Sequence, residues 1–241
     1  FKHLMIRTLM TDSVQSSSAA TTTTTSETTD DYETLAVKIE REKPENVTWK
    51  SYFQEQYNQW VFDPECNEEP DDVFNSRYRV LQCLKTWTSG ISKKKMTFGS
   101  VYRFKFEIVQ YIPGSNSYEV ILGITTHNKQ TMSKFKQDEG SSVFSQETKG
   151  LGINLGAWST RTDSTNVQIT TSDTRAPFKA GDVIGFVFDF RTTTLSLDVH
   201  FNGTKIATVD GTTLHADEST IFYATASLCT QKSVQMGPWH P

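Results

Sequence analysis

Apolar and polar residues alternate with a period of two along most of the chain after residue 45. Between Tyr102 and Ile108, aromatic and aliphatic residues alternate with Arg103, Lys105 and Glu107. Such alternation predicts strands that bury one face and expose the other. The same reasoning predicts strands at residues 101–112, 118–125, 182–190, 195–201, 204–209 and 223–228, with shorter candidates at 73–84 and 167–171.

A tight hairpin is predicted between two of these segments. Asn202 and Gly203 separate residues 195–201 from residues 204–209, and both residue types tolerate the positive φ of a type I′ turn. No long segment has a helical period. At least seven strands joined by turns therefore indicate an all-β fold, a two-sheet antiparallel β-sandwich.

The N-terminal part of the chain has a different composition. Residues 11–34 contain 14 Ser or Thr among 24 residues and almost nothing apolar, so they cannot bury enough surface to offset chain entropy. We therefore expect a disordered Ser/Thr-rich tail over residues 1–45 and one folded domain over residues 46–241.

Charge, apolar runs and cysteines exclude several classes of protein. The chain has 24 basic and 28 acidic residues, which gives no basic footprint for nucleic acid. No apolar run is long enough to span a membrane, and the first ten residues do not resemble a signal peptide. Three widely spaced cysteines fit neither a disulfide framework nor a zinc site. These features predict a cytoplasmic or nuclear protein with no nucleic-acid or membrane partner.

The strongest motifs resemble the SPRY domain family. Residues 178–190 read Phe-Lys-Ala-Gly-Asp-Val-Ile-Gly-Phe-Val-Phe-Asp-Phe, and Thr-Leu-Ser-Leu at 194–197 and Phe-Asn-Gly-Thr-Lys at 201–205 follow in the order and spacing of that family. Residues 101–108, 120–125 and 222–228 resemble its other strands, and Phe-Asp-Pro-Glu-Cys at 62–66 resembles the Asp-Pro segment that opens many such domains. Together the likeness covers about residues 60–236. The resemblance implies a sandwich of SPRY type that binds proteins or peptides through loops at one end.

The likeness weakens in the middle of the chain. The family's usual Ser-Trp-Gly is replaced here by Ala157, Trp158 and Ser159, and a long polar insert follows at residues 160–176. Family members differ in partner at such loops. The resemblance therefore implies the fold and a binding role, and it does not identify the ligand.

Signals for catalysis or for a cofactor are weak. The glycines at 150, 152 and 156 are not followed by the helix that a dinucleotide site requires. The five histidines lack metal-ligand spacing, and no Gly-x-Ser-x-Gly elbow is present. We therefore expect no enzyme activity, no cofactor and no metal site.

Aromatic residues in or beside polar loops are the best candidates for contact with a partner, because exposed aromatics carry much of the affinity of protein interfaces. The loops that we expect to form the site are residues 87–99, 112–117, 126–148, 158–175 and 229–233. The candidate residues within or beside them are Trp87, Tyr111, Asn116, Phe135, Phe144, Arg161, Cys229, Thr230 and Gln231.

Three functions compete at this point. The first is an adaptor-like interaction module for a peptide or partner protein, a substrate reader in a ubiquitin ligase among its roles, as the SPRY resemblance implies. The second is a structural subunit of a larger nuclear or cytoplasmic complex. The third and least favoured is a lectin-like sandwich, which would need carboxylates clustered on one sheet face.

Overall fold

The computed structural model describes residues 48, 51, 59–64, 73–74, 79–83, 87–112, 120–128, 130–132, 150–155, 159–162, 165–168, 178–192, 194–211, 214, 216–229 and 231–239. The chain divides into two units, residues 1–58 and residues 59–241. The predicted tail over residues 1–45, and its boundary with the folded domain, lie outside the described residues.

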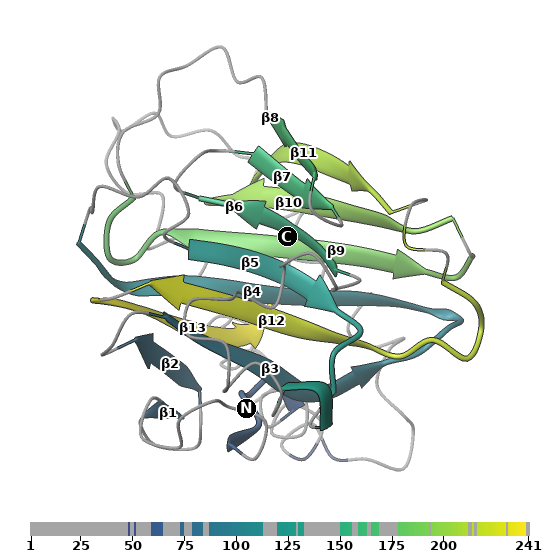
Figure 1. The fold of residues 1–241 in the computed structure, drawn as a ribbon, viewed down its shortest axis with the longest axis horizontal. Helices are drawn as coiled ribbons and strands as arrows, with labels where there is room; N and C mark the ends of the chain where they lie inside the picture. Colours follow the sequence, from purple (N-terminus) through teal and green to yellow (C-terminus); the bar gives the residue numbers. More distant parts are fainter. Residues whose placement is uncertain are drawn as a thin grey trace. The chain divides into compact units, whose positions relative to one another are not determined.

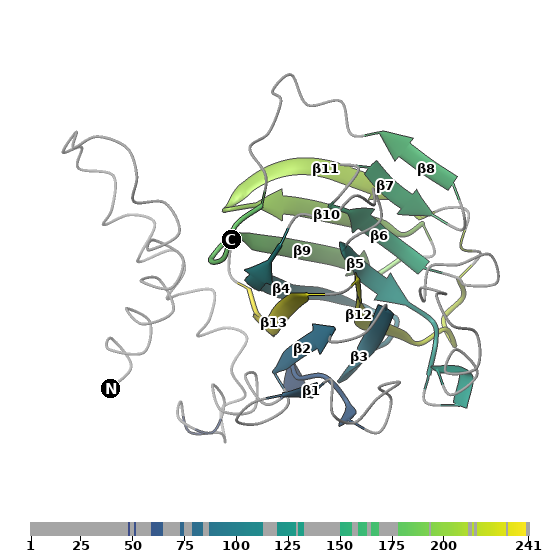
Figure 2. The same cartoon turned by 60° about the vertical axis from the view of Figure 1, so that its left-hand side comes forward.

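The second unit consists of two antiparallel sheets (Figures 1 and 2). One sheet has seven strands in the order β1 (Val73–Phe74), β2 (Val80–Cys83), β13 (Lys232–Pro238), β4 (Ser100–Tyr111), β9 (Val183–Phe190), β10 (Ser196–Phe201) and β11 (Thr204–Asp210). The other has six strands in the order β3 (Trp87–Met96), β12 (Phe222–Cys229), β5 (Val120–Thr125), β6 (Gly150–Asn154), β7 (Ser159–Thr162) and β8 (Thr165–Gln168).

This topology confirms the predicted all-β, two-sheet antiparallel sandwich. The regions predicted from clear alternation correspond to β4, β5, β9, β10, β11 and β12. Three of the expected loops were wrong in part. Residues 158–175 contain the short strands β7 and β8, β13 begins at Lys232 within residues 229–233, and residues 87–99 contain the ten-residue strand Trp87–Met96.

Hydrogen bonds from β12 explain why this polar segment is a strand. The hydroxyl oxygens of Ser89 and Ser227 lie 2.7 Å apart, and Thr225 Oγ1 donates to the Gly90 carbonyl oxygen at 3.0 Å. Thr225, Ser89 and Ser227 are completely buried. A buried hydroxyl is tolerated when it has a hydrogen-bond partner, so cross-strand pairing replaces the apolar pattern that sequence reasoning requires.

The core lies between the sheets, and phenylalanines of β4 and β9 form a large part of it on the side of the seven-stranded sheet. Phe104 of β4 stacks on Phe186 of β9, with ring centroids 5.2 Å apart. Phe188 of β9 meets Phe222 of β12 edge-on at 5.2 Å, which joins the two layers. Such pairs contribute roughly 0.5–1.5 kcal/mol each beyond the area that they bury. The alternation seen in the sequence therefore provides one aromatic face that aliphatic residues of the other sheet cover.

A tryptophan packs against the seven-stranded sheet on the side of Gly185, away from these rings. Trp239, which follows β13, is 6% exposed, and its ring centroid lies 4.5 Å from that of His200. A Cβ atom placed on Gly185 would lie 2.3 Å from Trp239 Cε2. Only glycine leaves room for the indole here, so Gly185 allows the C-terminal segment to pack against the sheet.

We expect Gly185→Ala to lower the free energy of unfolding by about 1–3 kcal/mol, because the added methyl overlaps the indole and forces it to shift. Gly237→Ala is the matched control, since its Cβ would meet no atom closer than Lys105 Cε at 3.7 Å. Urea unfolding of both variants measures the difference. Equal stability of the two would mean that Trp239 does not pack closely on Gly185.

The chain that follows β5 packs on the outer face of the six-stranded sheet. Met132 is buried against Ile91 of β3 and Ile121 of β5, with Tyr223 beside them. Before it, Asn128 Oδ1 accepts hydrogen bonds from the backbone amides of Gln130 at 3.0 Å and Thr131 at 3.2 Å. This turn directs Met132 onto the sheet.

His127 lies at the beginning of this packed segment and is half-buried. Its backbone amide donates to Thr125 Oγ1 at 3.2 Å. Burial lowers the pKa of its imidazole from the usual 6.5 to about 4, because the charged form loses its hydration.

We expect the protein to lose stability as the pH falls from about 6.5 towards 4. In this window the unfolded chain binds a proton at His127 and the folded chain does not, so protonation favours unfolding. The melting temperature of His127→Gln should therefore fall less between pH 7 and pH 5 than that of the unchanged protein. Burial also lowers the pKa of His200, so part of the pH dependence should remain. An unchanged pH dependence in the variant would contradict the assignment to His127.

Candidate functional site

Strand pairing gathers several predicted site residues at one end of the sandwich. Cys229, the last residue of β12, pairs with Trp87, the first residue of β3. Lys232, the first residue of β13, pairs with both Cys83 at the end of β2 and Tyr111 at the end of β4. We call this the Tyr111 end, where β2, β4 and β12 finish and β3 and β13 begin.

Tyr111 is the centre of the contacts at this end. Its ring packs edge-on against Phe178, with centroids 5.7 Å apart, and Phe178 packs in turn against Phe201 at 5.8 Å. Lys232 Nζ lies 5.4 Å from the centroid of the Tyr111 ring, and the Lys232 residue is only 3% exposed. A cation over an aromatic ring contributes about 0.5–2 kcal/mol, so these contacts hold the half-buried Tyr111 in one place.

An irregularity in β4 explains why Tyr111 faces these partners. Ser233 pairs with Gln110 and Val234 with Ile108, so Val109 is an extra residue on β4. Such a bulge interrupts the alternation of side chains between the two faces of a strand. As a result Tyr111 packs against the edge of the core, although strict alternation from Phe104 would place it on the outer face.

Two aliphatic side chains beside Tyr111 remain exposed. Val109 is 43% exposed and Ile112 is 45% exposed. Together with Ile221, they are the large hydrophobic residues that are exposed among those that the structure describes. Trp87 and Cys229 are half-buried at the same end. Apolar side chains that gather around fixed aromatics are typical of binding surfaces.

The turn between β12 and β13 completes this end. Gln231 is exposed and has a φ of 62°, a left-handed conformation that residues other than glycine rarely adopt. Its backbone amide donates to the Cys83 carbonyl oxygen at 3.0 Å. The turn is therefore held in an uncommon backbone conformation next to the aromatic residues.

A hydrogen-bond network makes the other side of the Tyr111 end rigid. Asn202 Oδ1 accepts from the Val183 amide at 2.8 Å, and Asn202 Nδ2 donates to Asp182 Oδ1 at 3.1 Å. Asp182 Oδ2 accepts from the Lys179 amide at 2.9 Å. The network ties the β10–β11 hairpin to the segment that carries Phe178, and so it positions the ring against which Tyr111 packs.

The predicted Asn-Gly hairpin supports this network. Asn202 and Gly203 have φ values of 47° and 85°, as the sequence predicts. We expect Gly203→Val to lower the free energy of unfolding by about 1–3 kcal/mol, because a β-branched residue is strained at positive φ. No atom lies within 4 Å of a Cβ placed there, so strain alone causes the loss.

Lys205→Val is the control for that prediction. Lys205 is exposed, and its Nζ lies 2.8 Å from Asp198 Oδ1, so the variant should lose only an exposed ion pair of about 0–1 kcal/mol. Thermal unfolding of both variants provides the comparison. Equal melting temperatures would show that the hairpin does not depend on glycine.

The structure describes some of the predicted site residues and not others. It brings Trp87, Tyr111, Cys229 and Gln231 together at the Tyr111 end. Arg161 lies on β7, paired with Gly152 and Asn166, and its side chain is outside the described residues. The remaining predicted residues outside the described part of the chain are Asn116, Phe135, Phe144 and Thr230.

The loop that contains Phe135 and Phe144 is anchored away from the Tyr111 end. It leaves β5 at Thr125 and rejoins the sheet at Gly150, which pairs with Thr125. Thr125 also pairs with Tyr223, at the end of β12 opposite Cys229. A contact of either phenylalanine with a partner therefore stays a prediction.

Sequence reasoning did not single out Val109, Phe178 or Asp182 as residues of the Tyr111 end, and it included Ile112 and Lys232 only as members of the expected site loops 112–117 and 229–233. Val109 and Ile112 belong to an alternating strand in the sequence, so their exposure follows only from the bulge and the strand end. Lys232 gives no sequence signal for burial, since lysine is rarely buried without partners. The sequence motif Gly-Asp-Val includes Asp182. Its hydrogen bond to Asn202 could not be inferred from the sequence, because it depends on how the hairpin folds back on this segment.

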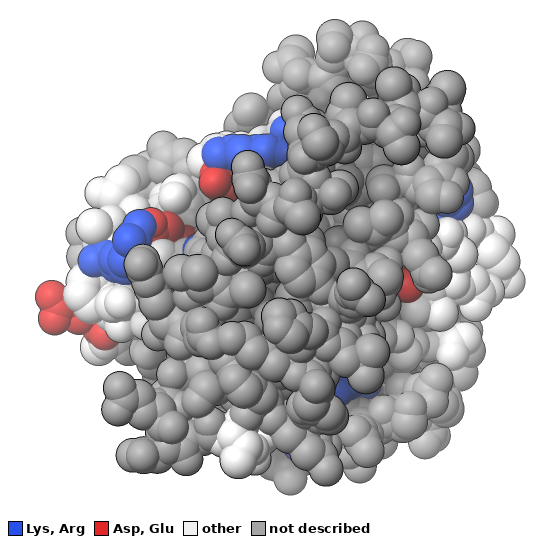
Figure 3. All heavy atoms as spheres, turned by 180° about the vertical axis from the view of Figure 1, so that it is seen from behind, with Lys and Arg blue, Asp and Glu red and all other residues white. Residues whose placement is uncertain are grey.

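Charges elsewhere on the described surface form local pairs. Lys105 Nζ lies 3.9 Å from Glu107 Oε2, in addition to the Lys205–Asp198 pair. In the view of Figure 3, blue and red side chains lie next to one another in the described part of the face. This described part carries mixed charge, unlike the extended basic patch of a nucleic-acid-binding surface.

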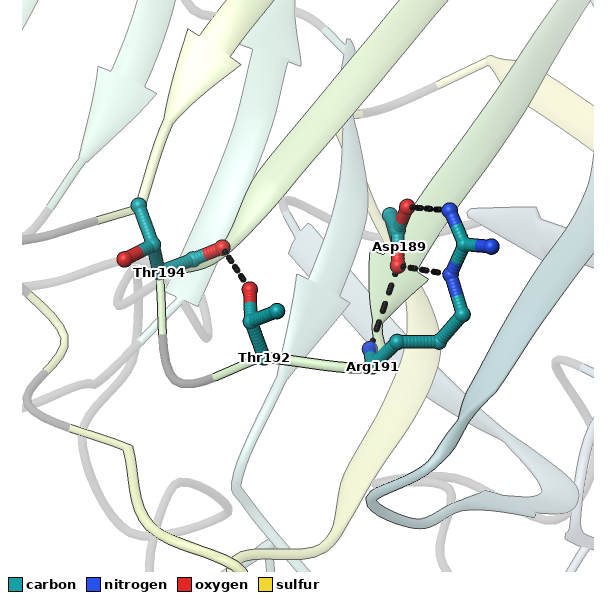
Figure 4. Close-up of polar contacts among 4 residues, drawn as sticks. All are labelled: Asp189, Arg191, Thr192 and Thr194. Atoms are coloured by element: carbon teal, nitrogen blue, oxygen red, sulfur yellow. Dashed lines mark hydrogen bonds and ion pairs between the residues drawn. The ribbon is translucent and has the colours of Figure 1, made fainter.

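A second polar cluster lies at the other end of β9 (Figure 4). The Arg191 side chain donates to both carboxylate oxygens of Asp189, and this hydrogen bonding lowers the pKa of Asp189. Thr192 Oγ1 donates to the Thr194 carbonyl oxygen at 3.0 Å. These contacts close the turn between β9 and β10, so their role is structural.

Within the described ranges, no group of three or more His, Cys, Asp or Glu residues could hold a metal ion. The described helical residues include no helix that is long and apolar enough to cross a membrane.

No protein-family model and no curated protein matches this sequence. Among solved structures, the chain is similar to the SPRY domain of human HERC1, with 17% identity, a TM-score of 0.48, and coverage of 75% of this chain and 99% of that one. It is also similar to the metal-free carbohydrate recognition domain of Emp46p, with 13% identity, a TM-score of 0.44, and coverage of 80% and 92%. A SPRY domain is thus among the similar structures, and these likenesses concern the fold alone.

Proposed function

We propose that this chain is a non-catalytic interaction module that binds a peptide or a partner protein through its Tyr111 end. The observation that carries the proposal is the position of Val109 and Ile112. Both are exposed aliphatic side chains, and they lie next to a tyrosine that Phe178 and Lys232 hold in place.

The energetics of this arrangement favour binding. Burying an exposed aliphatic side chain contributes about 25 cal/mol for each Å² of apolar surface removed from water. An anchor that is already ordered loses little side-chain entropy on association, and the contacts around Tyr111 provide that order. A few such residues at the centre of a patch commonly supply most of the affinity.

The chemistry of the described residues at this end supports a non-catalytic role. Asp182 already uses both carboxylate oxygens as acceptors in the structural network, so it is not placed to act as a base. Among the described residues of the Tyr111 end, no histidine lies beside Cys229 to activate its thiol in the manner of a nucleophile–base pair.

A role as substrate reader in a ubiquitin ligase, and a cytoplasmic or nuclear location, are the finer parts of the proposal. Both rest on the resemblance of residues 178–205 to SPRY domains. The alternative of a structural subunit predicts a stoichiometric partner that stays bound through purification. A separable peptide ligand would distinguish the interaction module from that alternative.

A partner can be captured from a cell lysate with the full chain. We expect Ile112→Asp to lower the affinity for that partner about tenfold or more, the usual scale for an anchor residue. The side chain is exposed, so the fold should be unaffected. Ile221→Asp is the matched control, because Ile221 is 38% exposed next to Phe222, at the opposite end of β12. Titration of the identified partner against each variant measures the effect.

A second pair of variants tests the aromatic anchor. Tyr111 and Tyr102 are both half-buried tyrosines of β4, and the Tyr102 hydroxyl bonds to Thr97 at the other end of that strand. Tyr111→Ala should lower the affinity for the partner, whereas Tyr102→Ala should leave it unchanged. If Ile221→Asp or Tyr102→Ala abolishes binding and the Tyr111-end variants do not, the site lies at the opposite end and the proposal is wrong.

A further inference from the structure

The charges at the Tyr111 end suggest the chemistry of the segment that binds there. Asp182 is 5% exposed, and its carboxylate points into the hydrogen-bond network that contains Asn202. Lys232 is 3% exposed and lies over the Tyr111 ring. Two lysines described at this end, Lys179 and Lys205, are exposed, and Lys205 Nζ lies 2.8 Å from Asp198 Oδ1.

Lys179 is attached to a rigid part of the backbone. Its amide donates to Asp182 Oδ2 at 2.9 Å, and the preceding residue, Phe178, contacts the Tyr111 ring. The Lys179 side chain forms no ion pair with another described residue. Its exposed side chain therefore belongs to the segment that packs Phe178 against Tyr111.

We propose, on the basis of the function proposed above, that the occupant is an extended peptide segment in which an Asp or Glu lies close to a large apolar residue. The apolar side chain packs against Tyr111 and Ile112, and the carboxylate pairs with Lys179. Charge complementarity carries this assignment, because the solvent-accessible carboxylates described nearest to this end, Glu107 and Asp198, lie within ion-pair distance of Lys105 and Lys205. Lys179 has no such partner among the described residues, so its positive charge is left to favour an acidic segment.

The contribution of the carboxylate is modest and depends on salt. An ion pair at the rim of an interface changes affinity by only a few fold, and it acts mainly on the association rate and on specificity. Reversal of the lysine charge has a larger effect, because an attraction is replaced by a repulsion. Lys179 therefore selects among peptides, and the aromatic and aliphatic residues hold them.

A random peptide library displayed on phage, selected against the immobilised full chain, tests the inference. Selected peptides should combine an Asp or Glu with a nearby large apolar residue, and they should no longer bind Ile112→Asp. A second selection against Lys179→Glu should favour Lys or Arg at the acidic position. Lys95→Glu is the matched control, because Lys95 is an exposed lysine that pairs with Tyr223, at the far end of β12 from Cys229.

The affinity of one selected peptide gives an independent readout. It should weaken by roughly two- to fivefold in Lys179→Ala, about the size of an exposed ion pair. Raising the salt concentration should weaken binding to the unchanged chain and should affect Lys179→Ala less.

The possible failures of the two proposals are distinguishable. Peptides that depend on Ile112 but show no acidic preference, or whose preference Lys179→Glu does not alter, would overturn this inference and leave the proposed function standing. A library that yields no peptide dependent on Ile112 would overturn the proposed function and this inference with it.

Discussion

The change of sheet between β12 and β13 is the constraint on which the Tyr111 end depends. Cys229 ends a strand of the six-stranded sheet and Lys232 begins a strand of the seven-stranded sheet, so the chain crosses the sandwich within two residues. The sharp turn that this crossing requires is formed at Gln231, which has a positive φ and donates its backbone amide to the Cys83 carbonyl oxygen. Because of this turn, Trp87 and Tyr111, which belong to different sheets, lie at the same end.

The rest of the molecule supports that end in two ways. The edge-on contact of Phe188 with Phe222 joins the two layers, and the Asp182–Asn202 network fixes the segment that carries Phe178. Exposed side chains at the Tyr111 end can therefore be substituted without loss of the sandwich fold. Binding sites are commonly built in this way on rigid scaffolds. In the proposed complex, apolar contact at Tyr111 and Ile112 would supply affinity, and Lys179 would select for an acidic residue.

Part of the candidate site could be predicted from the sequence. Trp87, Tyr111, Cys229 and Gln231 could be proposed because aromatic and polar residues near loops are common at interfaces, and strand pairing places them together. Val109 could not be predicted, since an aliphatic residue in an alternating strand is indistinguishable from a core residue, and Ile112 was included only as the first residue of the expected loop 112–117. The strand Trp87–Met96 was missed because its small polar residues are buried through cross-strand hydrogen bonds, which leave no apolar pattern.

The sequence alone determined the all-β class, the direction in which most strands present their apolar faces, and the hairpin at Asn202 and Gly203. These features are local, because alternation and turn conformation depend on neighbours in the chain. Only the tertiary structure decided that β13 lies between β2 and β4, and that Val109 forms a bulge and turns Tyr111 towards Phe178. Strand order and register arise from contacts between residues far apart in the sequence, and no local pattern encodes them.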